Sequence, residues 1–281
     1  MIISGKEAGD KIELPPADLL AELLEKAREI SQQTRALINE ALKRPFSYEI
    51  KEDNSFVTDI DLAVERRIRT ILNTSFPSHS IVGEELPSQV SNSDYQWIID
   101  PIDGTHSLRH RVPLFGTILA LRYRGAPVLG LIDLPGINRC YSGATGLGAW
   151  CDGRRLKVRD LEEGEMLGRE IISVGDRVQF LNAGKTAALD RLLGAHSSVR
   201  SYCDCFGHCM ALEGSIGAML DPGLRIWDVV ASVVLAREAG CKFCWLQSDD
   251  ESRFGGRYDI VFGKPTVVDW LVDLWKESST I

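Results

Sequence analysis

The chain has 281 residues, and its 40 acidic and 32 basic side chains give a formal charge of −8 at pH 7. That balance excludes a generic basic nucleic-acid binder. Hydrophobic residues make up 44 % of the chain and charged residues 26 %, which is typical of a globular protein with one large domain or two closely packed halves. The longest near-apolar stretch, 229–236, is too short to span a bilayer, and the first seven residues lack a secretory-signal pattern. We expect a cytoplasmic protein without membrane contact.

The first half of the chain predicts two helices followed by strands. Apolar spacing over 16–44 is helical, with prolines near its start and at its end. A polar, hairpin-like stretch, 46–56, leads to a second helix near Thr58-x-x-Asp61, which has the spacing of a capping box. Short strands are then expected at 79–83, 96–100, 114–122, 127–134, 140–142 and 148–151, the last four as an antiparallel meander.

After the charged segment 159–165 the pattern becomes alternating α/β. Strands are expected at 170–174, 198–202, 241–247 and 258–262, and helices at 184–194, 206–217, 227–238 and 266–277. A soft boundary near residue 160 divides the chain into an α+β half, 1–160, and an α/β half, 161–281.

Seven cysteines, an odd number in a chain large enough to fold without disulfides, favour reduced thiols. Cys203, Cys205 and Cys209 together with Cys241 and Cys244 could be imagined as a zinc site. The last two lie in a strand-like run, however, where an i, i+3 pair projects to opposite faces. Buried, apolar thiols are the favoured interpretation.

The segment 97–105, Trp-Ile-Ile-Asp-Pro-Ile-Asp-Gly-Thr, carries the strongest chemical signal. Asp100 and Asp103 end a buried strand, where two carboxylates repel each other unless a cation lies between them, and hard oxygen ligands favour Mg²⁺. Pro101 stiffens the turn, and Gly104 allows main-chain N–H groups to approach an anion. The loop can hold a metal ion and a phosphate together. An ordinary Asp-Pro turn is the alternative interpretation.

Three other acidic positions are weaker signals on their own. Glu84 follows a predicted strand, so it would emerge at the same sheet edge as Asp100 if the two strands are neighbours. Asp61 can simply cap its helix, and Asp228 near a helix N-terminus is favoured by the helix dipole without any function. The sequence has no Gly-x-Ser-x-Gly, Cys-x5-Arg, P-loop or Gly-x-Gly-x-x-Gly motif, which argues against those nucleophile and nucleotide-binding classes.

In chain order, the motifs 57–61 (Val-Thr-Asp-Ile-Asp), 83–85 (Gly-Glu-Glu), 100–105 and 227–228 (Trp-Asp) resemble the inositol monophosphatase superfamily of Mg²⁺-dependent, lithium-sensitive phosphatases. The resemblance covers residues 15–275 and implies a layered αβαβα sandwich, mixed α+β and α/β in class. It implies two or three Mg²⁺ ions, most of their ligands lying in the N-terminal half: Glu84, Asp100, the Ile102 carbonyl, Asp103 and Asp228.

The same resemblance implies catalytic roles. Asp61 and Thr105 would position the attacking water, with Glu84 counted among the catalytic residues. Backbone N–H groups of Gly104 and Thr105 would hold the phosphate. No protein nucleophile is then required, because metal ions can activate water for in-line displacement.

Within the superfamily, the runs 112–117 (Val-Pro-Leu-Phe-Gly-Thr) and 204–208 (Asp-Cys-Phe-Gly-His) are more similar to bacterial histidinol phosphate phosphatases, which act in histidine biosynthesis. Asp103, Asp204 and Asp221 would then contact the amine or imidazole of histidinol, or the hydroxyls of an inositol phosphate. The other interpretation of Asp204 and Asp221 is that they are solvated loop and helix-end acids.

Several alternatives stay open at this point. Inositol monophosphate and a nucleotide 3′-phosphate are the second and third candidate substrates, and a metal-binding regulatory protein on an inactive scaffold is a candidate of another class. A homodimer is expected, with no nucleic-acid polymer as partner. The basic cluster His106, Arg109, His110 and Arg111 either steers phosphate or is a solvated loop or subunit contact, and His208 is favoured as a satisfied core histidine.

Overall fold

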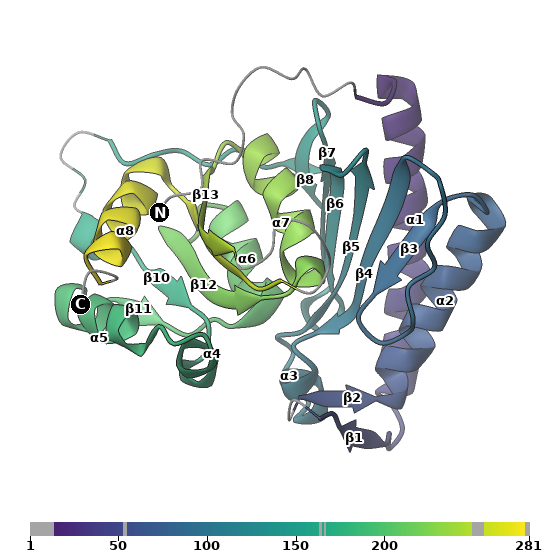
Figure 1. The fold of residues 1–281 in the computed structure, drawn as a ribbon, viewed down its shortest axis with the longest axis horizontal. Coiled ribbons are helices and arrows are strands. Elements are labelled where there is room, and N and C mark those ends of the chain that lie inside the picture. The colour runs from purple at the N-terminus through teal and green to yellow at the C-terminus, as the bar shows by residue number, and fades with distance from the viewer. Residues whose placement is uncertain (1–13, 53–54, 163–164, 166, 249–255, 279–281) are drawn as a thin grey trace.

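The computed structural model describes residues 14–52, 55–162, 165, 167–248 and 256–278. Its elements form five layers, helices–sheet–helices–sheet–helices, side by side in Figure 1. This is the αβαβα sandwich expected from the sequence. Within the described residues, no helix combines the length and the apolar character that crossing a bilayer requires.

A seven-stranded sheet forms the second layer. β3 (Ser80–Gly83) pairs in parallel with β4 (Tyr95–Asp103), so the two predicted strands are neighbours. The remaining strands continue from β4 as an antiparallel meander: β5 (Gly116–Tyr123), β6 (Ala126–Leu134), β7 (Arg139–Ala144), β8 (Gly148–Cys151) and β9 (Arg154–Arg155). A single 3₁₀ turn, η1 (Pro135–Ile137), joins β6 to β7.

Helices α1 (Ala17–Ala41) and α2 (Asp59–Ser75) cover the outer face of this sheet. Their apolar stripes recur every three to four residues, as in Leu20, Leu23, Leu24 and Ala27, and pack with Trp97 and other buried strand residues. Between the two helices the chain forms a hairpin of β1 (Tyr48–Ile50) and β2 (Phe56–Thr58), which lies beside the short helix α3 (Thr105–Arg109).

The middle layer consists of α6 (Asp204–Leu212) and α7 (Ile226–Ala239). α7 is buried nearly all round, because residues from both sheets pack against it in one core cluster. Gly130 of β6 allows this packing, since a Cβ there would lie 2.5 Å from the Ala231 carbonyl oxygen of α7.

The second sheet has five strands in the order β11-β10-β12-β14-β13, with β10, β11 and β12 parallel and β13 and β14 antiparallel. The strands are β10 (Ile172–Val174), β11 (Val199–Arg200), β12 (Ala218–Leu224), β13 (Lys242–Ser248) and β14 (Tyr258–Gly263). The outer layer contains α4 (Arg177–Asn182), α5 (Thr186–Ala195) and α8 (Pro265–Ser278).

The predicted helix at 206–217 was too long, and the strand β12 was missed. α6 ends at Leu212, because Gly214 adopts a left-handed conformation (φ 71°) that terminates the helix. Asp221, Pro222 and Gly223 look like a turn in the sequence, but they form a bulge within β12, where the pairing with β14 shifts between Asp221 and Leu224. α4 was also missed.

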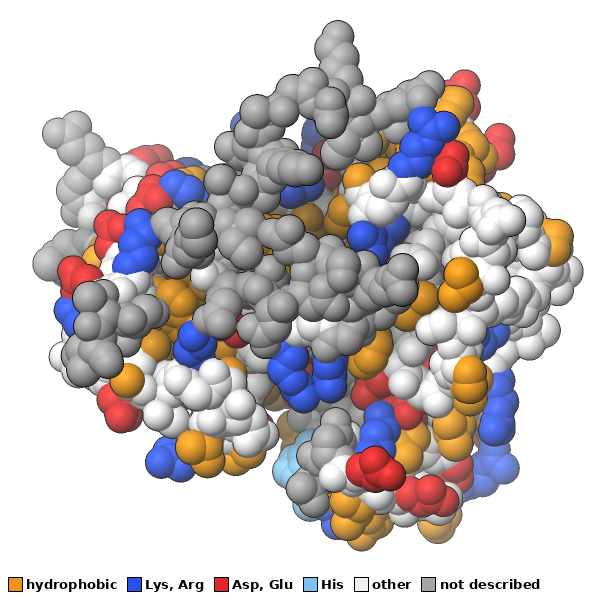
Figure 2. All heavy atoms as spheres, in the orientation of Figure 1, with side chains coloured by type: hydrophobic (Ala, Val, Ile, Leu, Met, Phe, Trp, Pro, Cys, Tyr) orange, Lys and Arg blue, Asp and Glu red, His pale blue; other side chains and the backbone are white. Residues whose placement is uncertain are grey.

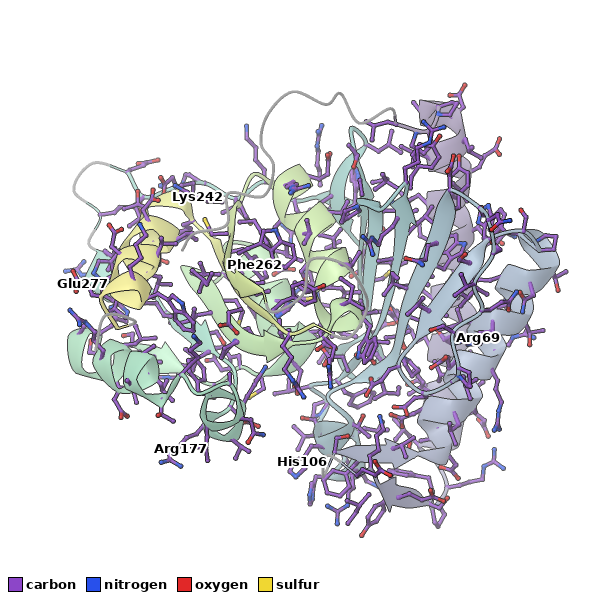
Figure 3. All side chains as sticks on the ribbon, viewed as in Figure 1. Arg69, His106, Arg177, Lys242, Phe262 and Glu277 are labelled. Carbon is purple, nitrogen blue, oxygen red and sulfur yellow. The ribbon has the colours of Figure 1, made fainter. Side chains whose placement is uncertain are left out.

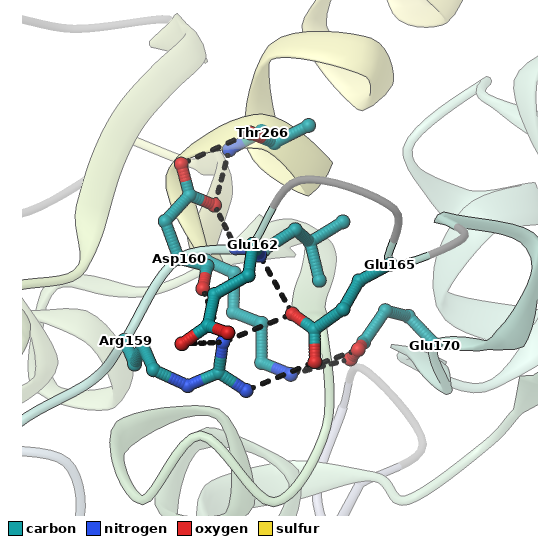
Figure 4. A network of polar contacts seen from close by, with 8 residues as sticks. Arg159, Asp160, Glu162, Glu165, Glu170 and Thr266 are labelled. Carbon is teal, nitrogen blue, oxygen red and sulfur yellow. Dashed lines mark hydrogen bonds and ion pairs between the residues drawn. The ribbon is translucent and has the colours of Figure 1, made fainter.

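The segment between the two sheets, which includes η2 (Leu167–Arg169), is fixed by polar contacts (Figure 4). Asp160 accepts hydrogen bonds from the Thr266 backbone N–H at 3.0 Å and its hydroxyl at 2.9 Å, at the first turn of α8. Lys264 pairs with Glu170 at 2.8 Å. The proposed division of the chain at residue 160 stays a prediction.

Candidate active site

Three carboxyl groups converge where β4 ends and α7 begins. Asp100, Asp103 and Asp228 each offer an oxygen, and these oxygens all lie within 4.8 Å of one another. Asp100 is 1 % exposed, and its Oδ1 has no hydrogen-bond partner among the described residues. Burial, followed by the charges of Glu84, Asp103 and Asp228, raises the pKa of Asp100. Asp103 and Asp228 are half-buried. Carboxylates this close together and shielded from solvent are costly unless a cation neutralises them, and oxygen donors of this kind suit Mg²⁺.

A bulge in the sheet brings Asp100 and Asp103 to the same place. Asp100 pairs with Ile118 of β5, but Asp103 pairs with Gly116, so the register shifts between them. The Thr117 hydroxyl donates to the Pro101 carbonyl at 2.8 Å and holds the bulged backbone. Because a bulge re-aims the side chains of its strand, both acids can face the same cavity.

The other half of the chain fixes two of these three acids. The Cys205 backbone N–H at the start of α6 donates to Asp103 Oδ2 at 2.5 Å. The Arg225 N–H donates to Asp228 Oδ2 at 2.7 Å. Asp228 therefore accepts a hydrogen bond at the N-terminus of α7, as an acid with a purely structural role would. It also belongs to the carboxylate cluster, where burial and then Glu84 raise its pKa to about 8.

Glu84 and Glu85 lie beside this cluster and share a lysine. The Glu84 N–H donates to the Ile99 carbonyl at 3.1 Å, which places Glu84 next to Asp100 at the edge of the parallel pair β3–β4. Lys51 Nζ lies 2.7 Å from Glu84 Oε1 and 2.6 Å from Glu85 Oε1. Lys51 was not predicted as a site residue, because no motif marks the polar stretch that carries it.

Asp61 both caps its helix and reaches the candidate site. It accepts a hydrogen bond from the Thr58 backbone N–H at 3.0 Å, and Thr58 in turn accepts from the first turn of α2. Its Oδ1 lies 3.0 Å from Thr105 Oγ1, which is also 3.0 Å from the Ile102 carbonyl oxygen. Burial raises the pKa of Asp61 to about 6, against the hydrogen bonds from Thr58 and Thr105.

Gly104 is required by the backbone at the turn before α3. Its φ is 84°, a conformation that favours glycine, and a Cβ would lie 3.0 Å from both Asp204 Oδ2 and the Leu114 carbonyl oxygen. The turn can therefore pass close to the second half of the chain only because this residue has no side chain.

A cavity of about 450 Å³ adjoins the cluster and is strongly acidic. Five carboxylates line it, from both halves of the chain: Asp103, Asp176, Asp204, Asp221 and Asp228. No lysine or arginine is among the described residues that line it, and Arg177 of α4 points away from the molecule in Figure 3. Figure 2 shows the molecule notched at its lower edge, where α4 faces the hairpin and α3.

Asp221 is not a solvated acid, whereas Asp204 is the half-buried first residue of α6. Asp221 lies within β12, is 1 % exposed, and accepts hydrogen bonds from Gln179 Nε2 at 2.7 Å and His208 Nε2 at 3.1 Å. Burial and then the charges of Asp221 and Asp176 raise the pKa of Asp204 to about 7. His208 is a satisfied core histidine, since its Nδ1 lies 2.8 Å from Ser232 Oγ.

Asp176 and Gln179 were missed by the sequence analysis. Asp176 lies two residues after the end of β10, so its position near the carboxyl end of a strand, like that of Asp100, could have identified it. Gln179 carries no comparable signal, because it enters the cavity through α4.

The cysteines form no metal site among the described residues. All seven are free thiols; Cys151, Cys205 and Cys209 are buried. The other four, Cys140, Cys203, Cys241 and Cys244, are half-buried, so the prediction of buried thiols holds fully only for the first three.

Comparison with known proteins places this geometry in a family. Residues 19–271 match the inositol monophosphatase family. The chain belongs to that family and is a phosphatase. It is 30 % identical over 266 residues to fructose-1,6-bisphosphatase/inositol-1-monophosphatase of Aquifex aeolicus, covering 91 % of this chain and 97 % of the relative.

Two further similarities bear on this family member. It is 30 % identical over 254 residues to the histidinol-phosphatase of Chlorobaculum parvum, covering 90 % of this chain and 91 % of the relative. The solved structure of an inositol monophosphatase from Anabaena superposes with a TM-score of 0.78 at 27 % identity, covering 92 % of this chain and 97 % of that one.

Proposed function

We propose that this chain is a Mg²⁺-dependent phosphatase that hydrolyses L-histidinol phosphate. The observation that carries the proposal is the cavity beside the carboxylate cluster, which five carboxylates line without a described lysine or arginine. A substrate whose alcohol portion is cationic complements the charge of such a cavity, whereas a neutral polyol gains only hydrogen bonds there and a second phosphate is repelled.

Asp100, Asp103, Asp228, Glu84 and the Ile102 carbonyl are the proposed ligands of two or three Mg²⁺ ions. The partnerless Asp100 Oδ1 and the three converging oxygens fit hard divalent cations. When bound, such ions supply a water of lowered pKa, neutralise the phosphate and stabilise the leaving alkoxide.

The chain's own residues would then orient the reactants. Thr105 Oγ1 and Asp61 Oδ1, 3.0 Å apart, form a fixed pair that can hold a water and accept its proton at the Asp61 carboxylate. Backbone N–H groups of Gly104 and Thr105 are the proposed phosphate donors. The pKa of Asp61, raised to about 6, leaves this residue mostly ionised and able to accept a proton above that pH.

Substrate selection is assigned to Asp204, with Asp103 and Asp221 at the same cavity. Asp204 lines both this cavity and the larger one that contains Asp100, Gly104 and Thr105. A carboxylate in that position can pair with an amine or imidazolium while the phosphate lies at the metal loop. Gln179 and His208 hold Asp221 in place beneath it.

Inositol 1-phosphate is the second candidate substrate, because the same carboxylates and Gln179 can accept and donate hydrogen bonds to hydroxyls. One of the chain's relatives is named for that activity and for fructose 1,6-bisphosphate.

The test is the ratio of kcat/KM for histidinol phosphate to that for inositol 1-phosphate, measured with saturating Mg²⁺. We expect histidinol phosphate to be preferred, and Asp204→Asn to lower its kcat/KM by about 100-fold while changing that for inositol 1-phosphate much less, as loss of one partner of a desolvated charge pair costs about 2–5 kcal/mol. Asp190→Asn, an exposed acid of α5, is the matched control.

Faster turnover of inositol 1-phosphate by the unsubstituted enzyme would overturn the substrate assignment. An equal loss on both substrates in Asp204→Asn would place Asp204 in the common machinery. No turnover of any phosphate monoester with saturating Mg²⁺ would instead favour the regulatory scaffold.

A further inference from the structure

The hairpin β1–β2 depends on contacts with other elements for its stability. It consists of two three-residue strands that form their own two-stranded sheet, separate from both main sheets. The side chains of β1 are exposed. Isolated two-stranded hairpins are marginally stable at best in water, so contacts with other elements must hold this one in place.

One side of the hairpin rests on the guanidinium of Arg109, the last residue of α3. Arg109 Cζ lies 4.2 Å from the ring centroid of Tyr48 and 4.6 Å from that of Phe56, which are themselves 5.8 Å apart in an edge-to-face arrangement. Arg109 Nη2 also donates to the Tyr48 hydroxyl at 3.0 Å. One planar cation therefore contacts both strands of the hairpin.

His106 of α3 and His110, which follows α3, add tilted ring contacts to this cluster. The His106 ring lies 5.6 Å from Phe56 and 4.9 Å from His110. Figure 3 shows His106 on α3 beside the hairpin. Arg111 does not contact the hairpin rings but donates to the carbonyl of Leu42, the residue that follows α1, at 2.6 Å. The basic cluster therefore packs on aromatic rings and a helix end, although His106, His110 and Arg111 remain exposed.

The other end of the hairpin reaches the acidic site. Lys51 directly follows β1, and its N–H donates to the Ser55 carbonyl at 2.8 Å, closing the hairpin. Its ammonium contacts Glu84 and Glu85. The position of the hairpin consequently fixes where this charge lies relative to Glu84.

We propose that Arg109 is a positioning residue, which docks the β1–β2 hairpin onto α3 through Tyr48 and Phe56 and thereby sets the place of Lys51 against Glu84 and Glu85. None of the contacts that Arg109 makes with described residues reaches the carboxylate cluster. Arg109 acts through Lys51. The role of Glu84 as a Mg²⁺ ligand comes from the proposed function, whereas the docking does not depend on it.

The first test is hydrogen exchange of the full-length, metal-free protein. Arg109→Ala should speed exchange of the amides in 48–58 about tenfold, because two cation–π contacts and a hydrogen bond are lost together, and leave the amides of α7 unchanged. Tyr48→Phe, which keeps the ring, should have a smaller effect, and Arg109→Lys should restore part of the protection. Arg124→Ala is the matched control, since Arg124 lies 5.1 Å from the Tyr123 ring in a different turn.

The second test asks whether Arg109 acts through Lys51. The Lys51 ammonium competes with a divalent cation for Glu84, so Lys51→Met and Arg109→Ala should each tighten binding of Mg²⁺ alone, by about threefold in calorimetric titration. In the Lys51→Met background, Arg109→Ala should have no additional effect.

Unchanged hairpin exchange in Arg109→Ala would overturn the docking. Uniformly faster exchange over the whole chain would mean a general structural role and would also overturn it. Additive effects on the Mg²⁺ affinity would overturn the action through Lys51. If the unsubstituted protein binds no Mg²⁺, the proposed function fails, but the exchange experiment still decides the docking.

Discussion

Asp100→Asn tests two roles proposed for the carboxylate cluster: that it destabilises the metal-free fold and that it binds metal. The substitution keeps the shape of the side chain and removes its charge. Because Asp103, Asp228 and Glu84 crowd Asp100, the metal-free variant should be at least as stable as the unsubstituted protein at pH 8. The variant should lose its turnover and should no longer be stabilised by Mg²⁺.

The magnitudes follow from the site. One pKa unit corresponds to about 1.4 kcal/mol, so raising the pKa of Asp228 from an ordinary value near 4 to about 8 reflects strain on the order of several kcal/mol. Burial and the neighbouring carboxylates raise the pKa of Asp100 as well. Mg²⁺ at 100 times its Kd should add about 2.7 kcal/mol, or roughly 5–10 °C in Tm, to the unsubstituted protein.

Thermal unfolding in EDTA and in saturating Mg²⁺, together with turnover, measures both roles. Asp100→Asn should show no Mg²⁺-dependent rise in Tm, and its kcat should fall by about 1000-fold, equivalent to about 4 kcal/mol of transition-state stabilisation. Asp94→Asn, an exposed acid just before β4, is the control and should behave like the unsubstituted protein.

Two outcomes would refute this reasoning. If Asp100→Asn keeps the Mg²⁺-dependent rise in Tm and its turnover, Asp100 is not a ligand. If the metal-free variant is several kcal/mol less stable than the unsubstituted protein, Asp100 stabilises the fold itself and the crowding argument is wrong.

Other predictions concern pH and packing. In EDTA, the free energy of unfolding should fall as the pH rises from about 5 to 8, because burial raises the pKa of Asp204 to about 7 and of Asp228 to about 8, so the folded state binds more protons than the unfolded chain over that range. Urea unfolding at each pH measures this free energy. Saturating Mg²⁺ should make the free energy of unfolding depend less on pH, and a rise in the free energy of unfolding with pH would contradict the prediction. Gly130→Ala should lower the free energy of unfolding by about 1–3 kcal/mol, because its Cβ would meet the Ala231 carbonyl at 2.5 Å. Gly194→Ala, where a Cβ meets nothing within 4 Å, should show no loss in the same urea experiment.

The sequence by itself determined the elements whose signals are local. Helical spacing predicted α1 and α2, alternating apolar runs predicted the meander β5–β8, and the segment 97–105 marked Asp100 and Asp103 as neighbours in one loop. The capping box of Thr58 and Asp61 could also be predicted, because it involves residues only three positions apart.

Only the tertiary structure decided which distant groups meet. The Cys205 N–H reaches Asp103 over 102 positions of sequence, and Lys51 reaches Glu84 over 33. β12 could not be predicted from the sequence, because its bulge residues look like a turn. Its register is set by pairing with β14. Such contacts depend on strand register and on the packing of two sheets against α7, which are long-range properties that no short segment encodes.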